Sequence, residues 1–138
     1  RSEFVEGMKR GDIDKVLTLT KALMASIPYD SLPPDKLFLR EHNYQTTIYL
    51  IFTLMGQYVR TEVHSSMGRS DVEVETKDGI YIFEFKVNTQ GSAQDAIDQI
   101  KDREYYQAVS AEGRPVHLVG VSFDEKTRNV GEWKEEVR

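Results

Sequence analysis

The amino-acid sequence predicts an α/β domain in which helices cover both faces of one mixed sheet. Two helical patterns come first, three segments of alternating residues follow, and one more helix and one more apolar strand complete the order. A chain of 138 residues with 39% hydrophobic side chains has the size of one domain and can bury a core. One compact unit is therefore expected.

The first helix is expected over residues 12–27, because Asp12 is a suitable N-cap and apolar residues follow at three-four spacing. Pro28 and the run Leu32-Pro33-Pro34 end it. A second, longer helix is expected from about Asp35 to Gly56. Its buried face is predicted to carry Phe38, Gln45, Ile48, Phe52 and Met55.

The period then changes from helical to alternating, which predicts three strands. Residues 58–64 form the first, residues 71–75 the second after a turn at 65–70, and residues 80–87 the third. Asp78-Gly79 is a strong hairpin signal between the last two. The expected arrangement is an antiparallel meander.

A third helix is predicted from Ser92, its N-cap, to about Gly113, with Ala108 among its inward residues. The apolar run 115–123 predicts a buried strand, which the helical crossover places parallel to the third strand. The tail 124–138 is interpreted as a turn and an exposed amphipathic segment around Val130 and Trp133.

The hairpin brings together three side chains that carry chemistry. A two-residue loop at Asp78-Gly79 puts Asp71 opposite Lys86 and diagonal to Glu84, whereas a four-residue loop puts Asp71 directly opposite Glu84. Either register leaves all three side chains on one face. Two carboxylates on strands about 5 Å apart repel unless a proton or cation lies between them, and Mg²⁺ takes carboxylate ligands of this kind. Lys86 then lies where it can orient a metal-bound water.

The tripeptide Glu-x-Lys carries little information alone, because the chain contains it at residues 75–77, 84–86 and 132–134. Only Glu84-Phe85-Lys86 lies inside an apolar strand, where an unpaired Glu or Lys is costly to bury. The context therefore selects this copy.

Composition narrows the possible functions. The chain has no cysteine, so any metal ligand must be oxygen or imidazole, and a reducing, cytoplasmic setting is expected. No apolar run approaches the ~20 residues of a membrane span, so no membrane partner is expected. A net charge of −5 argues against strong nonspecific DNA affinity. A start at Arg1 is interpreted as the start of a piece cut from a longer chain.

The order of these elements and residues resembles the PD-(D/E)XK nuclease core over residues 36–123. The resemblance rests on Glu41 in a helix, Glu62 on a strand, the segment Gly68-Arg69-Ser70-Asp71, and Glu84-Phe85-Lys86. It implies a restriction-endonuclease-like αβββαβ core with an extra N-terminal helix. The wording Gly-Arg-Ser-Asp, Ile-Phe-Glu-Phe-Lys, Gly-Ser-Ala, Gln-Ile-Lys and Val-Gly-Val-Ser-Phe is similar, more narrowly, to the nuclease-like domain at the C-terminus of bacterial AAA-ATPase-like proteins.

Carried over residue by residue, the resemblance implies Asp71 and Glu84 as metal ligands, the Phe85 carbonyl as a third, and Lys86 as the catalytic lysine. Glu41 corresponds to the helix glutamate that joins the metal shell directly or through water. Gln99, with Tyr105 or Tyr106, resembles a Gln-x-x-x-Tyr element, although Arg103 stands at the +4 position.

Structural alternatives exist for each residue. For Asp71, Glu84 and Lys86 the alternative is a salt bridge within the sheet, which is less favoured because charged residues rarely enter apolar strands without a role. Glu41 has the neighbours of a solvated helix carboxylate. Glu62 and Glu73 are interpreted as charges on a strand face, with Glu73 in phase with the site. His42 and His64 make a weak zinc case, because they lack ligand spacing.

The expected function is hydrolysis of DNA by a phosphodiesterase dependent on Mg²⁺ or Mn²⁺. The alternative is an inactive nuclease-fold module that binds DNA or protein. The resemblance implies an upstream ATPase domain in the full-length chain, to which residues 1–34 form the link, and a nuclease-like domain over residues 35–138. Oligomeric state and nucleic-acid preference are not predicted.

Overall fold

The structure is a computed structural model, and it describes residues 3–26, 47–66 and 69–138. Its centre is a five-stranded mixed sheet in the order β1-β2-β3-β4-β5. Every neighbouring pair is antiparallel except β3 and β4, which are parallel. The strands are β1 (Arg60–Ser66), β2 (Arg69–Thr76), β3 (Gly79–Val87), β4 (Val116–Asp124) and β5 (Asn129–Val137). The predicted α/β class with a mixed sheet is confirmed.

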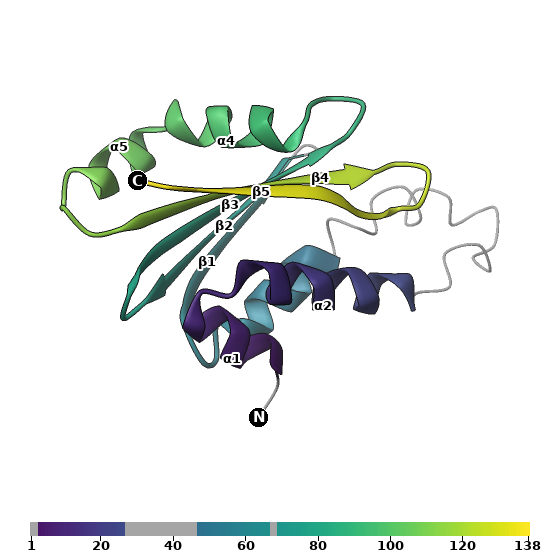
Figure 1. Cartoon of the computed structure of the whole chain (residues 1–138), viewed down its shortest axis with the longest axis horizontal. Helices are drawn as coiled ribbons and strands as arrows, with labels where there is room; N and C mark the ends of the chain where they lie inside the picture. Colours follow the sequence, from purple (N-terminus) through teal and green to yellow (C-terminus); the bar gives the residue numbers. More distant parts are fainter. Residues whose placement is uncertain (1–2, 27–46, 67–68) are drawn as a thin grey trace.

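Helices cover both faces of this sheet (Figure 1). One face carries α1 (Glu3–Arg10), α2 (Ile13–Ala25) and a helical segment at 47–55. The other carries α4 (Ala93–Lys101) and α5 (Glu104–Ser110). Within the described ranges, none of these helices has the length and apolar character needed to cross a bilayer.

The N-terminal helices follow from local capping. The Asp12 side chain accepts from the Lys15 backbone N–H at 3.1 Å, which confirms the predicted start of α2. Helix α1 was not expected from the sequence. It ends because Gly11 adopts φ 72°, while the N–H groups of Gly11 and Asp12 bond the Met8 and Gly7 carbonyls at 3.0 and 2.9 Å. The left-handed conformation of Gly11 therefore ends α1, and α2 begins two residues later, at Ile13.

The central strand β3 is buried on both faces, as its apolar sequence predicts. Tyr81, Phe83 and Phe85 join the core under α1, α2 and segment 47–55, where the rings of Phe52 and Phe83 lie 5.2 Å apart. Ile80 and Ile82 point the other way, into a second core under α4 and α5. Met8, Leu17 and Met24 belong to the first core, so the N-terminal helices and the sheet share one interior.

The predicted hairpin is present, but its turn is shifted by one residue. Thr76 pairs with Gly79, so Lys77 and Asp78 are the loop residues rather than Asp78 and Gly79. Gly79 has φ 155° and no room for a side chain, because an added Cβ would lie 2.6 Å from the Pro115 carbonyl oxygen. The close approach of the Pro115 backbone therefore explains the glycine at position 79 better than the turn does.

The predicted continuous helix over 92–113 is wrong, because it breaks into α4 and α5. The Asp102 N–H closes α4 on the Gln99 and Ile100 carbonyls, and Arg103 is extended at φ −90° and ψ 141°. The break changes the helical phase. Ala108, expected inside, is exposed, and Val109 is buried in its place.

The tail was also misjudged, because residues 129–137 form strand β5 rather than an exposed amphipathic segment. A turn held by Asp124, whose side chain accepts from the Lys126 and Thr127 N–H groups, precedes it. Val130 is buried in the main core and Trp133 packs against that core. The outer residues of β5 are charged, as is usual for a strand at the edge of a sheet.

Candidate metal centre

Asp71 and Glu84 face each other across β2 and β3, on the face that α4 and α5 cover. Directly opposed residues of an antiparallel pair point to the same side of the sheet. Both side chains are buried, with 7% of Asp71 and 1% of Glu84 exposed. The direct opposition of Asp71 and Glu84 is the one that the sequence offered for a four-residue loop, although the observed loop has two residues, Lys77 and Asp78. This register places two carboxylates together in a low-dielectric environment.

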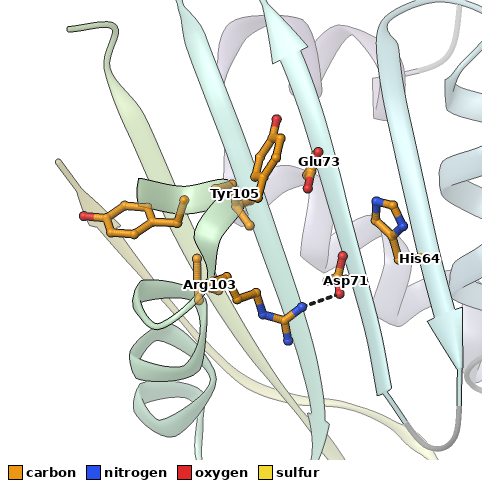
Figure 2. Close-up of a pocket in the computed structure, with 8 residues that line it drawn as sticks. His64, Asp71, Glu73, Arg103 and Tyr105 are labelled. Atoms are coloured by element: carbon orange, nitrogen blue, oxygen red, sulfur yellow. Dashed lines mark hydrogen bonds and ion pairs between the residues drawn. The ribbon is translucent and has the colours of Figure 1, made fainter. Parts of the chain in front are cut away.

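A guanidinium lies between these carboxylates. Arg103 Nη1 donates to Asp71 Oδ2 at 2.6 Å, and its Nη2 donates to Glu84 Oε1. Figure 2 shows the bond from Arg103 to Asp71. The Arg103 side chain is 19% exposed, so the three groups form a largely buried ion triad. The cation that the carboxylate pair requires is supplied by the chain itself in this structure.

Lys86 follows on the same face as Glu84, two residues along β3, and pairs in register with Ser122 of β4. Its stem runs past Gly91, where an added Cβ would lie 3.0 Å from Lys86 Cδ. Within the described part of the chain Lys86 makes no ion pair, and its charge contributes, as a minor cause, to the lowered pKa of Asp95. Lys86 therefore lies on the same face as the carboxylates, and its side chain runs toward the start of α4.

The structure describes the other predicted site residues, Phe85, Gln99 and Glu41, less fully. Phe85 points its ring into the opposite core, 5.9 Å from the ring of Phe52, and the proposed role of its carbonyl stays a prediction. Gln99 lies on α4, and its buried Oε1 has no hydrogen-bond partner among the described residues. Glu41 lies outside the residues that the structure describes.

A cavity of about 350 Å³ opens beside the carboxylates and is lined by His64, Asp71, Glu73, Arg103 and Tyr105, among others (Figure 2). Register explains the gathering, because Glu62 pairs with Glu73 and His64 with Asp71 across β1 and β2. One possible ligand atom from each of Glu62, His64 and Glu73 lies within 4.8 Å of the others. This group could hold a metal ion. The sequence had indicated strand-face charges for Glu62 and Glu73 and only a weak zinc case for His64.

Electrostatics set this cavity apart from ordinary surface. Burial raises the pKa of Glu73, the charges of Glu62 and Asp71 raise it further, and a hydrogen bond from Tyr105 opposes the rise. Burial and the nearby Glu73 carboxylate likewise raise the pKa of the Tyr105 hydroxyl, which stays protonated. The cavity thus combines crowded negative charge with a phenol donor.

The positions of three of these residues, Arg103, Glu62 and His64, were not predicted from the sequence, and there are two separate reasons. Arg103 was visible as a basic residue four positions after Gln99, but nothing in the sequence showed that its backbone leaves the helix there. Glu62 and His64 alternate correctly on their strand. The register of β1 against β2 depends on the length of the connection between these strands, which the sequence did not determine.

Comparison with known proteins shows the superfamily to which the chain belongs. A sequence profile of the PD-(D/E)XK nuclease superfamily matches residues 39–133, and the chain belongs to that superfamily. Nucleases of this superfamily generally use divalent metals. A protein of Azotobacter chroococcum mcd 1, described as an uncharacterized protein in the vnfD 5′ region, is 37% identical over 119 residues, which is 86% of this chain. The chain spans 23% of that relative's length. No solved structure matches.

Proposed function

We propose that this domain is a metal-dependent phosphodiesterase that hydrolyses DNA. The observation that carries the proposal is the opposition of Asp71 and Glu84 on one face, with Lys86 two residues further along the same strand. Oxygen ligands paired in this way suit Mg²⁺ or Mn²⁺, which retain positions for water and phosphate oxygens. Superfamily membership supports nuclease-type chemistry.

The roles of the residues follow from their chemistry. Asp71 and Glu84 would hold the ion, with the Phe85 carbonyl and Glu41 as further ligands. When bound, the ion would lower the pKa of water and offset negative charge on the phosphate. The Lys86 ammonium would bind a non-bridging phosphate oxygen and orient the attacking water. Gln99 of α4 would help to position the substrate at the carboxylate site.

A second candidate is an inactive nuclease-fold module that binds DNA or protein. Arg103 favours it, because the guanidinium already forms an ion pair with both carboxylates. The net charge of −5 also disfavours strong binding of a polyanion by this domain alone. In either case we propose that the domain works in the cytoplasm with an upstream ATPase of the same full-length chain, with residues 1–34 as the link to residues 35–138.

The deciding experiment compares wild type with Lys86→Ala on linear and circular DNA in Mg²⁺ or Mn²⁺. Loss of one positioned proton-transfer or charge-stabilising group reduces rates by about 10²–10⁴-fold, so Lys86→Ala should be nearly inactive. Lys77→Ala is the matched control, because Lys77 is exposed in the β2–β3 turn. Equal cleavage by wild type and Lys86→Ala would exclude this mechanism, and no cleavage by wild type would favour the inactive module.

A further inference from the structure

We propose that Arg103 and a divalent cation are alternative occupants of the Asp71–Glu84 pair, so that metal binds only when the guanidinium leaves. This competition presupposes the metal site of the proposed function. The contact that motivates this proposal is a bridge: one terminal nitrogen of the Arg103 guanidinium donates to Asp71 at 2.6 Å, and the other donates to Glu84. A metal ion that binds both carboxylates would need the position that the guanidinium occupies.

Charge makes the two occupants exclusive. Both carboxylates are at least nine-tenths buried, and the guanidinium itself is 19% exposed, so solvent screens the site weakly. A guanidinium and a divalent ion held at the same two carboxylates would repel each other strongly in this setting. Either cation alone can bind between the two carboxylates, whereas both together would repel each other.

The location of Arg103 allows it to leave. It is the extended residue between α4 and α5, and its side chain does not cap α5. Helix α5 is short, and Val109 is its one fully buried residue. Elements with few buried apolar contacts rearrange at low cost. The cavity of about 350 Å³ that Arg103 lines gives the side chain space beside the carboxylates.

Metal affinity tests the competition directly. Mn²⁺ is titrated calorimetrically into the full chain as wild type and as Arg103→Met. Removing a competitor that holds the site most of the time raises apparent affinity by the reciprocal of the free fraction, so Arg103→Met should bind at least about ten-fold more tightly. Arg114→Met is the matched control, because Arg114 pairs with Glu75 at 2.8 Å on the same face and outside the carboxylate pair. Affinity in Arg103→Met equal to or weaker than wild type would overturn the inference.

Thermal unfolding supplies an independent readout. In EDTA, Arg103→Met should melt below wild type, because two buried carboxylates lose their counter-charge. Saturating Mn²⁺ should raise its melting temperature more than that of wild type. If Arg103→Met does not fold without metal, Arg103→Lys takes its place. A lysine cannot bridge both carboxylates with a planar fork, so it should bind Mn²⁺ more tightly than wild type, and an unchanged or weaker affinity would contradict competition.

A further variant separates the two proposals. Adding Asp71→Ala to Arg103→Met should remove the tight Mn²⁺ site, and persistence of that site would remove both the metal assignment and the competition. Competition observed in a protein that cleaves no DNA would leave the inference standing while the proposed activity fails. Cleavage that depends on Lys86, with Mn²⁺ affinity unaffected by Arg103, would have the opposite meaning.

Discussion

Individual side chains decide what the carboxylate pair can do. Asp71 and Glu84 approach because the β2–β3 register opposes them, and burial makes a positive partner necessary. Arg103 provides that partner from a helix junction, while Lys86 stands further along β3 without an ion pair in the described chain. One cation is therefore committed to neutralising the acids, and the second is available for chemistry.

Gly120 is a position where one methyl group should disturb the centre. It pairs with Glu84 in the β3–β4 register, and an added Cβ would lie 2.0 Å from the Ala93 carbonyl oxygen at the start of α4. Backbone cannot yield as a flexible side chain does, so Gly120→Ala should lower the free energy of unfolding by about 2–3 kcal/mol, measured by urea denaturation.

The control is Gly7→Ala in α1, where the nearest contact of an added Cβ is an ordinary 3.4 Å. That change should be neutral or should stabilise by up to about 1 kcal/mol, since alanine favours helix. If Gly120→Ala proved as stable as wild type, α4 would not lie as closely on β4 as the structure shows.

At the scale of elements, α4 is held over the site by its N-terminus. The Ser92 side chain accepts from the Asp95 N–H at 3.1 Å, and the Asp95 carboxylate accepts from the Ser92 N–H at 2.9 Å. This capping box fixes where α4 begins. Because Ala93 meets Gly120 directly, the same box determines where the helix sits on β4.

The capping box predicts a pH dependence. The Ser92 backbone and side-chain hydrogen bonds lower the pKa of Asp95 below its ordinary value of 3.8. A lowered folded pKa means that the carboxylate stabilises the fold above pH 3.8, and that this stabilisation disappears as pH falls through the folded pKa. Wild type should therefore exceed Asp95→Ala in stability at pH 7, and the difference should shrink below pH 3.8.

Urea midpoints of both proteins between pH 7 and pH 3 measure this difference. Asp98→Ala, which changes an exposed carboxylate of the same helix, is the comparison for general acid effects. A gap between wild type and Asp95→Ala that stayed constant down to pH 3 would show that the ionised cap does not contribute.

The elements differ in how far local sequence determines them. Strand β3 and the parallel strand β4 were predictable, because continuous apolar runs bounded by turn residues permit few other structures. The break at Asp102 and Arg103 was not, since neither glycine nor proline marks it and its stabilising contacts lie on β2 and β3. Strand β5 escaped for a similar reason. Its charged residues mask the alternation, and pairing with β4 creates the strand.

At the scale of the whole molecule, the two faces of the sheet differ in how much of each is apolar core. The first face is packed by α1, α2 and segment 47–55, and Trp133 Nε1 of β5 donates to Asp14 of α2 at 2.7 Å. The second face carries an apolar core only near Ile82 and Leu118, and gives way to the carboxylates, the cavity and α5. Stability comes mainly from one side, which leaves the other free to hold buried charge.

Under the proposed function, the negative charge of the molecule should make its affinity for DNA depend on a bound metal ion. Net charge is −5, and the cavity beside the carboxylates gathers Glu73 and Asp71 next to Glu62. A phosphate backbone approaching this face meets like charge unless a cation intervenes. Under the proposed function, a Lys86→Ala protein should bind a labelled DNA duplex at least about ten-fold more tightly in Ca²⁺ than in EDTA, because Ca²⁺ accepts the same oxygen ligands.

Fluorescence anisotropy at fixed ionic strength measures this affinity. Asp71→Ala in the same background should lose most of the Ca²⁺ effect, whereas Asp78→Ala in the exposed β2–β3 turn should retain it. Because diffuse ions screen every acidic group alike, the contrast between these two aspartates separates a bound cation from general screening. Equal affinity in Ca²⁺ and EDTA would mean that DNA approaches by another surface, and the carboxylate pair would then not be the place where nucleic acid and metal meet.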